Sequence, residues 1–596
     1  MQTTFGCLGQ IPGRRMIFRE LDRRTFFASI ALCILTLVPA RGQEPRRVYT
    51  PPPLDTVHSV PAEHGMVVAQ EKIGAQIGAD ILRRGGNAVD AAVATGFAMA
   101  VTYPPAGNIG GGGFMVIHMR GREDVAIDYR EAAAAATTPQ IFLGSDGRPD
   151  AAKSRDSALG IGVPGTVAGL ALALEKYGSG KFTLADLLQP AIELARDGFV
   201  VTGNFADSLP EWHKRIVRWP SSAKLFSRSD GTPLLDGDRF VQGDLAATLS
   251  VIAAQGPRGF YEGPVAEKLV KAVDDAGGIM AMEDLKSYAA IVRQPVHGSY
   301  RGHDIVSMPL PSSGGVVLVE MLNILEGFAM ADLKQGSAAS LHLMIEAMKR
   351  AYADRARYLG DPASTDAPIA TLIAKDYADK QRASINPDRA TPWNEMLAVT
   401  SPHEGSNTTH FSVVDSSGNA VSNTYTLNFP YGVGLVAEGT GVLLNNELDD
   451  FTAAPGASNA YGLVGYEANL PGPGKRPLSS MSPTIVLKDG QPMLVTGSPG
   501  GSRIISTVLQ VVVNVLDYHM DVAAAVAAPR LHHQWKPDVV LIERGFPDEV
   551  LAALRAKGHQ VAEPMGPTSA NSIAVTATGL EGAPDPRSRG SDAAGQ

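Results

Sequence analysis

A threonine two-thirds of the way along the 596-residue chain has the surroundings of a nucleophile that becomes an N-terminus. Thr408 follows Asn407 and a proline-containing, loop-like stretch over 387–406, and it precedes an alternating strand pattern over 409–415. Its hydroxyl could attack the Asn407 carbonyl, and hydrolysis of the ester would free the Thr408 α-amine. That amine could then serve as the base for its own hydroxyl. An ordinary turn or an N-glycosylation acceptor is the alternative interpretation of the same residues.

Two consecutive glycines could supply the oxyanion hole that such a nucleophile needs. Gly500 and Gly501 lie in the segment TGSPGGSRI (496–504), just before an apolar stretch expected to be helical. Glycines let successive backbone N–H groups point at one spot, and a helix N-terminus favours negative charge. This is the geometry that stabilises an oxyanion, although a tight strand-to-helix turn would need the same residues.

Longer motifs around these residues resemble one enzyme family. The C-terminal half contains NTTHFSVVDSSGNAVSNTYTLN (407–428), GVLLNNELDDF (441–451), KRPLSSMSPT (475–484) and TGSPGGSRI. The N-terminal half contains GNAVDAAVA (86–94), GNIGGGGFM (107–115), DYRE (128–131) and PSSGG (311–315). Together they resemble γ-glutamyltransferase, also called γ-glutamyltranspeptidase, of the N-terminal-nucleophile hydrolases. The resemblance covers roughly residues 55 to 587.

The resemblance implies a complete catalytic and binding site. Thr408 is the implied nucleophile, Thr426 orients it, and the two glycines hold the oxyanion. A γ-glutamyl group carries an α-carboxylate and an α-ammonium, so its pocket needs both charge signs. The residues implied for the carboxylate are Arg130, Ser479 and Ser480, and those implied for the ammonium are Asn428, Glu447 and Asp450. Some family members have glutamine at the position of Glu447, where a carboxylate still accepts hydrogen bonds.

The segment 452–465 resembles the lid loop of the family, with Tyr461 as the residue that closes over the substrate. On its own the segment is typical of a surface loop. A lid that excludes water would favour transfer of the acyl group to amines over hydrolysis. Its presence favours a γ-glutamyltransferase over a related acylase without a lid.

The resemblance thus predicts a self-processing γ-glutamyltransferase and glutathione hydrolase that needs neither a metal nor an organic cofactor. Cleavage at Asn407–Thr408 would leave a large subunit, 43–407, and a small catalytic subunit, 408–596, as a heterodimer. Donors would be glutathione and other γ-glutamyl compounds, and acceptors would be water, amino acids or peptides. Two alternatives stay open: an acylase for glutaryl or cephalosporin-type amides, and a non-catalytic exported protein that binds glutamyl groups.

The N-terminus has the pattern of a cleaved signal peptide, over residues 1–42. Arg23 and Arg24 precede an apolar run over 26–38, and small residues follow it. The run is too short to span a bilayer comfortably. The paired arginines fit a twin-arginine signal or an ordinary secretory signal, and Met16 is an alternative start. Both cysteines, Cys7 and Cys33, lie in this segment, so the mature protein would have no disulfide or thiolate ligand. We expect a periplasmic or extracellular bacterial enzyme.

Composition is that of an ordinary globular protein, with 44% apolar and 19% charged residues. The net charge of −9 includes no basic block, which argues against a nucleic-acid partner. Length alone suggests about four domains, whereas the resemblance implies one interwoven α+β unit, a four-layer αββα sandwich. Periodicity predicts helices over 75–82, 88–100, 163–177, 184–197 (capped by Thr183), 341–358, 505–517 and 548–557. Strands are predicted over 409–415, 419–427, 440–444, 483–488, 492–496, 539–543 and 572–576, with a disordered tail after Arg587.

Three further patterns suggest ligand sites but have plainer interpretations. The GxGxxG sequence at 160–165 lacks a preceding strand, and Pro164 removes an N–H that a phosphate would need. The glycines at 110–113 are followed by no Lys-Ser or Lys-Thr, so close backbone packing is the better interpretation. His532 and His533 could suggest a metal, but adjacent side chains diverge on regular structure.

Overall fold

The computed structural model describes residues 49–392 and 408–596. The proposed signal peptide and Asn407 therefore lie outside the described residues. Tyr49 to Gln596 form one compact unit rather than four. Its centre consists of two seven-stranded antiparallel sheets.

The first sheet carries the strand that begins at Thr408. Its strand order is β21-β2-β10-β11-β3-β4-β7. The strands are β21 (Asp592–Gly595), β2 (Gly65–Ala69), β10 (Thr408–Asp415), β11 (Ala420–Thr426), β3 (Gly112–His118), β4 (Val125–Tyr129) and β7 (Ile291–Arg293). The second sheet has the order β1-β20-β19-β15-β14-β9-β8. Its strands are β1 (Val60–Ala62), β20 (Gly579–Ala583), β19 (Ser572–Thr576), β15 (Gln491–Thr496), β14 (Thr484–Lys488), β9 (His303–Ser307) and β8 (Val296–Tyr300).

Both sheets mix strands from before and after Thr408. In the first sheet, β10 and β11 lie between β2 and β3, and in the second sheet β14 and β15 lie between β9 and β19. The two parts of the chain therefore share both sheets. A break of the backbone before Thr408 would leave these hydrogen-bonded ladders intact.

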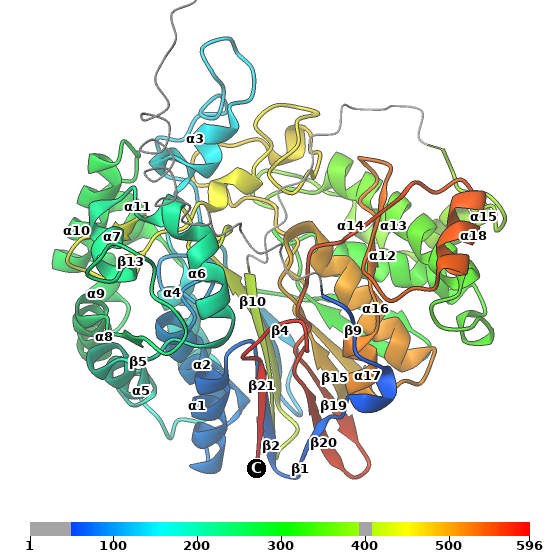
Figure 1. The fold of residues 1–596 in the computed structure, drawn as a ribbon, viewed down its shortest axis with the longest axis horizontal. Helices are drawn as coiled ribbons and strands as arrows, with labels where there is room; N and C mark the ends of the chain where they lie inside the picture. The colour runs from blue at the N-terminus through cyan, green and yellow to red at the C-terminus, as the bar shows by residue number, and fades with distance from the viewer. Residues whose placement is uncertain (1–48, 393–407) are drawn as a thin grey trace, which may run out of the picture. The chain divides into compact units, whose positions relative to one another are not determined.

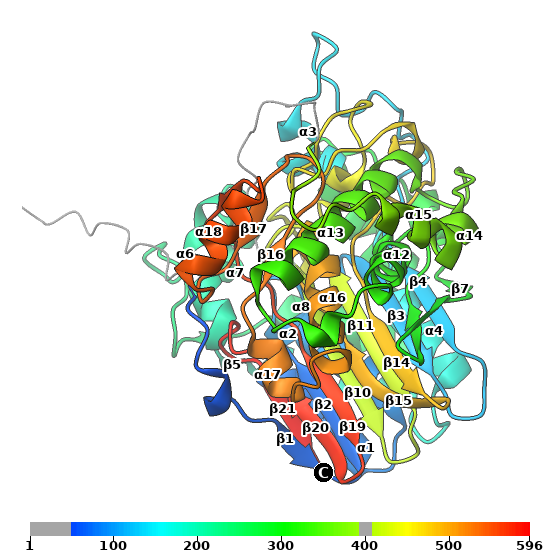
Figure 2. The same ribbon diagram turned by 90° about the vertical axis from the view of Figure 1, so that its right-hand side faces the viewer.

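Helices cover the outer face of each sheet, which makes four layers (Figures 1 and 2). On the first sheet lie α1 (Lys72–Arg83), α2 (Ala88–Thr102) and α4 (Thr166–Tyr177), with α5 (Leu184–Asp197), α8 (Gly243–Gln255) and α10 (Gly263–Asp275) outside them. On the second sheet lie α12 (Gly314–Glu326), α16 (Ile504–Leu516) and α17 (Val522–Ala527), with α13 (Ala338–Tyr358) outside. This arrangement confirms the expected αββα sandwich.

Shorter elements complete the unit. The other helices are α3 (Ala151–Arg155), α6 (Gly203–Ile216), α7 (Pro220–Phe226), α9 (Arg258–Tyr261), α11 (Met282–Ser287), α14 (Ile369–Leu372), α15 (Lys375–Ala383) and α18 (Asp548–Ala556). Three small sheets pair β5 (Phe199–Val200) with β6 (Arg239–Phe240), β12 (Val436–Ala437) with β13 (Val442–Leu443), and β17 (Val540–Ile542) with both β16 (Leu531–His532) and β18 (Val561–Ala562). Single 3-10 turns include Glu447–Asp450 and Gly501–Arg503.

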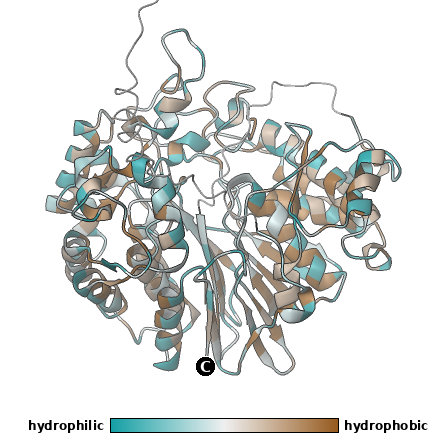
Figure 3. Ribbon diagram, in the orientation of Figure 1, coloured by the Kyte–Doolittle hydropathy of each residue, from teal (hydrophilic) through white to brown (hydrophobic). Residues whose placement is uncertain are grey.

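The apolar core is divided by the sheets into three main parts. Between the sheets, Phe114 and Val116 of β3 pack with Val306 of β9, Ile485 of β14 and other buried residues. The two outer parts lie between each sheet and its helices. Figure 3 shows the apolar residues concentrated in the strands and in the helices beside them. Because alternate strand residues face opposite sides, a central strand such as β3 contributes to two of these cores, with Phe114 and Val116 on one side and Met115 and Ile117 on the other.

The predicted elements are found with small shifts at their ends, and one prediction is wrong. The helix predicted over 184–197 has those bounds, and Thr183 forms its capping box. The predicted strand 440–444 is shortened to Val442–Leu443. The tail after Arg587 is ordered, because β21 pairs with β2 from Met66↔Gly595 to Ala69↔Asp592. The tail supplies an edge strand whose partner lies more than 500 residues earlier, a pairing that local sequence does not reveal.

Candidate active site

Thr408 and Thr426 are brought together by strand pairing. Thr408 is the first residue of β10, Thr426 is the last of β11, and they are register partners. The Thr408 hydroxyl donates to the Thr426 hydroxyl across 3.3 Å, and Thr426 Oγ1 also accepts from the Asn428 backbone N–H at 2.9 Å. Both threonines are buried. The threonine that the resemblance implies as orienting residue thus lies beside Thr408.

The glycine-rich segment that leads into β3 packs directly against this pair. A Cβ on Gly111 would lie 2.1 Å from the Thr426 carbonyl oxygen, and one on Gly113 would lie 2.4 Å from Tyr425 Cβ. Asn108 donates from Nδ2 to the Thr426 carbonyl at 2.8 Å and accepts from the Gly111 N–H at 2.8 Å. Close backbone approach, rather than a phosphate cradle, therefore explains these glycines. Asn108 is a positioning residue that sequence reasoning did not single out.

Nearly all the residues implied by the resemblance line one small pocket. It encloses about 20 Å³, little more than the space one water molecule requires. Among the implied residues that the structure describes, Gly500 is the one that does not line it, although its neighbour Gly501 does. The pocket is lined by Arg130, Thr408, Thr426, Asn428, Glu447, Asp450, Tyr461, Leu463, Ser479, Ser480, Met481, Gly501, Ser502 and Ile504.

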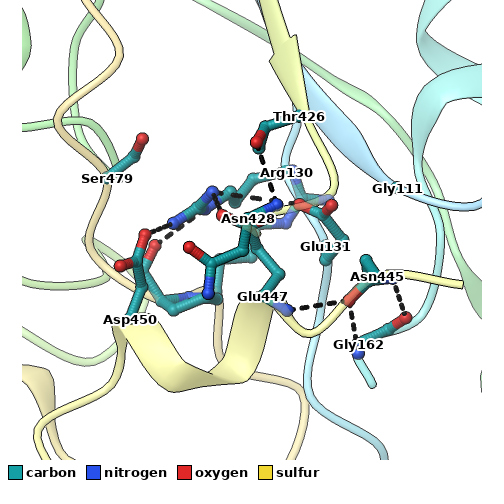
Figure 4. Close-up of polar contacts among 12 residues, drawn as sticks. Gly111, Arg130, Glu131, Gly162, Thr426, Asn428, Asn445, Glu447, Asp450 and Ser479 are labelled. Carbon is teal, nitrogen blue, oxygen red and sulfur yellow. Dashed lines mark hydrogen bonds and ion pairs between the residues drawn. The ribbon is translucent and has the colours of Figure 1, made fainter. Parts of the chain in front are cut away.

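A buried arginine and two carboxylates give the pocket both charge signs (Figure 4). Arg130 donates from Nη1 to Glu447 and from Nη2 to Asp450, the latter at 2.6 Å. Its Nε donates to the Pro477 carbonyl at 3.1 Å. Burial alone would lower the pKa of Arg130, but the charges of Glu447 and Asp450 outweigh it and raise the pKa. The guanidinium is therefore a permanent cation in this pocket.

A third carboxyl group, Glu131, lies beside this pair. It is fully buried, Oε2 lies 4.0 Å from Arg130 Nη1, and neither oxygen has a hydrogen-bond partner among the described residues. Burial raises the pKa of Glu131 to about 8, against the lowering effect of Arg130. Burial also raises the pKa of Glu447, which Arg130 again opposes. One cation cannot balance three neighbouring carboxylates, of which Glu131 and Glu447 are fully buried, so Glu131 is protonated at neutral pH. Glu131 is the last residue of the DYRE motif, and the resemblance implies no role for it.

Asn445 fixes the position of Glu447 and explains the GxGxxG sequence. Asn445 Oδ1 accepts from the N–H groups of Glu447 at 3.0 Å and Gly162 at 2.9 Å. Its Nδ2 donates to the carbonyls of Gly162 and Gly110, both at 2.8 Å. The interpretation that this sequence does not bind a dinucleotide agrees with this packing role. The two consecutive asparagines, Asn445 and Asn446, lie in the motif GVLLNNELDDF. They are a sequence signal for this packing role that sequence reasoning missed.

The two serines lie on a segment held by the PSSGG motif. Ser479 donates its N–H to the Pro311 carbonyl at 2.9 Å, and its own carbonyl accepts from the Ser313 hydroxyl at 2.6 Å. Ser480 Oγ accepts from Arg355 Nη2 at 3.2 Å. A second buried arginine, on α13, therefore contacts the serine segment. Sequence reasoning missed Arg355, because its helix alone does not show that it contacts Ser480 and Ser313.

Gly500 and Gly501 have backbone conformations that other residues rarely adopt, with φ of 135° and 58°. They lie between β15 and α16, at the start of the turn Gly501–Arg503. A Cβ on Gly501 would lie 2.6 Å from Tyr461 Cδ1, so the lid tyrosine packs on this glycine. The Tyr461 hydroxyl donates to Asn428 Oδ1 at 2.8 Å and contacts the Asn428 carbonyl at 3.1 Å. The lid thus lies closed over the pocket.

A possible metal-binding group lies elsewhere. One ligand atom each from His342, Glu346 and His559 lie within 4.8 Å of one another. Glu346 already accepts from Arg350 and from the N–H and hydroxyl of Thr391, and the two histidines bond each other at 2.7 Å. Glu346 and His342 are therefore engaged by protein partners, whereas His559 Nδ1 has no hydrogen-bond partner among the described residues. His532 and His533 have separate partners, Ser506 and Gln534 for the first and Asp538 for the second, as divergent side chains predict.

Comparison with known proteins agrees with this geometry. The family model for gamma-glutamyltranspeptidase matches residues 74–595. The glutathione hydrolase proenzyme of Escherichia coli is 51% identical over 538 residues, which is 90% of this chain and 92% of that protein. The crystal structure of a cephalosporin acylase from Bacillus halodurans aligns with a TM-score of 0.79 at 26% identity, covering 93% of this chain and 99% of that chain. That of Helicobacter pylori gamma-glutamyltranspeptidase aligns with a TM-score of 0.53 at 46% identity, covering 54% of this chain and 91% of that chain. The chain belongs to the gamma-glutamyltranspeptidase family.

Proposed function

We propose that the protein is a self-processing γ-glutamyltransferase and glutathione hydrolase, with Thr408 as its nucleophile. The observation that carries the proposal is a single pocket that holds a strand-initial threonine, a buried arginine and two carboxylates. This combination matches a γ-glutamyl substrate, whose reacting carbonyl is joined to a zwitterionic α-carbon.

Self-cleavage creates the active nucleophile. The Thr408 hydroxyl attacks the Asn407 carbonyl, the Asn407–Thr408 amide shifts to an ester, and water releases the Asn407 carboxylate and the Thr408 α-amine. The large subunit, 43–407, and the small subunit, 408–596, stay joined as a heterodimer by the two mixed sheets.

The freed α-amine is the general base in this proposal. No histidine or lysine lines the pocket among the described residues, and Glu447 and Asp450 are engaged by Arg130. The nearby His410 is buried and bonded to Thr424 and Ser412, and burial lowers its pKa to about 3. An α-amine has an ordinary pKa of about 8, so a neutral fraction is present at working pH.

The charged groups hold the glutamyl α-carbon. Arg130, with Ser479 and Ser480, binds the α-carboxylate, and a guanidinium suits this because it can form two parallel bonds. Asn428, Glu447 and Asp450 accept from the α-ammonium. A zwitterion adds no net charge, so it can insert between Arg130 and its carboxylate partners without leaving a buried charge unpaired.

The reaction then proceeds through an acyl-enzyme. Thr408 Oγ1 attacks the γ-carbonyl, its proton passes to the α-amine, and backbone N–H groups at Gly500 and Gly501 stabilise the oxyanion. The leaving amine takes the proton as the C–N bond breaks. Water or an acceptor amine next attacks the ester, which releases glutamate or a new γ-glutamyl product and restores the Thr408 hydroxyl. Thr426 orients the nucleophile, and Tyr461 closes the lid.

Export completes the proposal. The N-terminal segment 1–42 is proposed as a signal peptide that delivers the enzyme to the periplasm or the exterior of the cell. Among the described residues, every helix is too short or too polar to cross a membrane.

The choice of substrate tests the proposed function. Purified protein should release p-nitroaniline from γ-glutamyl-p-nitroanilide much faster than from glutaryl-p-nitroanilide, which lacks the α-ammonium. Because a structure with a TM-score of 0.79 is a cephalosporin acylase, the reverse preference would establish the acylase alternative. Glutamate binding without turnover of either compound would establish a binding protein.

A further inference from the structure

A second, larger cavity lies on the outer side of the lid. It has a volume of about 400 Å³, against about 20 Å³ for the pocket at Thr408. Its walls are α3 with the segment before it and the lid (Figure 1, cyan and yellow near the top). The lining residues are Phe142, Pro149, Asp150, Ala151, Ser154, Arg155, Asp449, Phe451, Ala453, Ala457, Ser458, Asn459, Ala460 and Gly462.

The two spaces share a thin wall but no lining residue. Asp450 lines the inner pocket, and its neighbour Asp449 lines the outer cavity. In the same way Tyr461 lines the inner pocket, whereas Ala460 and Gly462 on either side of it line the outer one. The wall is therefore one backbone thick at these two places, and both places belong to the turn and lid that close the inner pocket.

The outer cavity contains an arginine and a carboxylate of its own. Arg155 Nε lies 3.4 Å from Asp449 Oδ1, and it has no hydrogen-bond partner among the described residues. The Arg155 side chain is 28% exposed, whereas that of Asp449 is 3% exposed. Arg155 thus pairs only loosely with Asp449 and has donor capacity to spare, because a guanidinium carries five N–H groups.

Asp449 is placed more firmly than Arg155. Its Oδ1 accepts from the Ser154 hydroxyl at 2.5 Å, and its Oδ2 accepts from the Ala460 N–H at 3.3 Å. Burial raises the pKa of Asp449, and Arg155 opposes the rise. The carboxylate therefore ties α3 to the lid and leaves one positive and one negative group in a cavity large enough for a small zwitterion.

We propose that this outer cavity is the binding site for the acceptor, an α-amino acid or a short peptide, with Arg155 holding its carboxylate and Asp449 its α-ammonium. The inference rests on the proposed function, because it assigns the second substrate of the same reaction. The inner pocket repeats the same recognition on the other side of the wall, with Arg130 for a carboxylate and Asp450 for an ammonium.

Asp449 also gives the acceptor a route to react. The acceptor ammonium loses one proton to Asp449 or to solvent and becomes a neutral amine. When the lid wall at Tyr461 moves, the amine nitrogen attacks the γ-glutamyl ester carbonyl. The new C–N bond forms, the bond from the carbonyl to Thr408 Oγ1 breaks, and the second amine proton passes to Oγ1. The carboxylate of the acceptor stays on Arg155 during this step.

The test compares acceptors with and without a carboxylate. γ-Glutamyl-p-nitroanilide is the donor, and glycylglycine or its C-terminal amide is the acceptor. In Arg155→Met the ratio of transfer to hydrolysis with glycylglycine should fall about tenfold, through a higher KM for the acceptor, because one charge-assisted contact is lost. The ratio with the amide should be the same as in wild type. Arg155→Lys should recover part of the loss with glycylglycine.

A control and a second variant make the outcomes distinct. Arg148→Met removes a highly exposed arginine of the same segment that lies outside the cavity lining, and it should keep both ratios. Asp449→Asn should weaken both acceptors. An equal loss with glycylglycine and its amide in Arg155→Met would overturn the site, because it would indicate a general effect on the lid. If wild-type protein released no p-nitroaniline, the proposed function itself would fail and the acceptor site with it.

Discussion

The hydroxyl oxygens of Thr408 and Thr426 lie 3.3 Å apart, where the first residue of β10 meets the last residue of β11. The contact depends on strand register, since a shift by one residue would turn one side chain to the other face of the sheet. Thr426 is in turn held by Asn108 through its carbonyl and by the Asn428 N–H through its hydroxyl. The nucleophile is therefore positioned by two strands and by a segment 300 residues earlier.

Removing the Thr426 hydroxyl should slow the reaction while the fold is retained. Thr426→Val keeps the branched shape but lacks the oxygen, so Thr408 loses its partner, and kcat should fall about 10- to 100-fold. Thr426→Ser keeps the oxygen and should retain most activity. Initial rates with γ-glutamyl-p-nitroanilide and the extent of self-cleavage on a denaturing gel measure both effects. Equal activity of the two variants would show that the hydroxyl has no role.

Asp450 should discriminate between substrates with and without an α-ammonium. In Asp450→Asn, kcat/KM for γ-glutamyl-p-nitroanilide should fall about 10- to 100-fold, because a charged hydrogen bond is lost. The much lower rate with glutaryl-p-nitroanilide should change by less than about threefold. Asp489→Asn, in an exposed turn, is the control. A parallel loss on both substrates would mean that Asp450 acts only by supporting Arg130.

Glu131 should make the stability of the protein depend on pH. Its folded-state pKa of about 8 lies above the ordinary value of 4.5. Between pH 4.5 and 8 the folded protein keeps a proton that the unfolded chain has lost, so stability falls as pH rises through this window. The glutamine of Glu131→Gln cannot titrate. The melting temperature of this variant minus that of wild type should therefore be larger at pH 8 than at pH 5. Exposed Glu123→Gln is the control, and a constant difference for Glu131→Gln would contradict the assignment.

The C-terminal strand should contribute to stability. Ending the chain at Gly590 removes β21 and exposes the edge of β2, which pairs with it over four residues. The melting temperature should fall by at least about 3 °C, because a ladder and buried Ala593 are lost. Removing Gln596 alone leaves the ladder and should have a smaller effect. An unchanged melting temperature in the longer truncation would show that β21 is dispensable.

Local patterns in the sequence predict most elements, and the resemblance to a known family predicts most residues of the pocket. The helix after Thr183 follows from its cap and its periodicity, and β10 and β11 follow from alternation around a short turn. The pocket residues could be named because they lie in long motifs. Gathering them needs the fold, since Arg130 and Asp450 are 320 residues apart in sequence and 2.6 Å apart in space.

Local patterns do not reveal the elements and contacts that depend on partners distant in the chain. The edge strand β21 is short and has no β-branched or aromatic residue, and only its pairing with β2 makes it a strand. Asn108 contacts Thr426, Asn445 contacts Glu447, and Arg355 contacts Ser480. These contacts form because sheets and helices from both halves of the chain meet at the pocket. An isolated asparagine or arginine carries no signal for such a contact. The ion pairs of Arg130 with Glu447 and Asp450 likewise form because the fold buries these residues together. The spacing of the three residues in the sequence does not predict them.

The central claim is that Thr408 becomes an N-terminus, and intact mass tests it most directly. Purified wild-type protein and Thr408→Ala should be measured side by side by mass spectrometry. The account predicts two wild-type fragments that meet between Asn407 and Thr408, and one uncleaved chain for the variant. A single uncleaved wild-type chain, or a variant cleaved at the same bond, would contradict it, because Thr408 would then have no free α-amine or no part in making one.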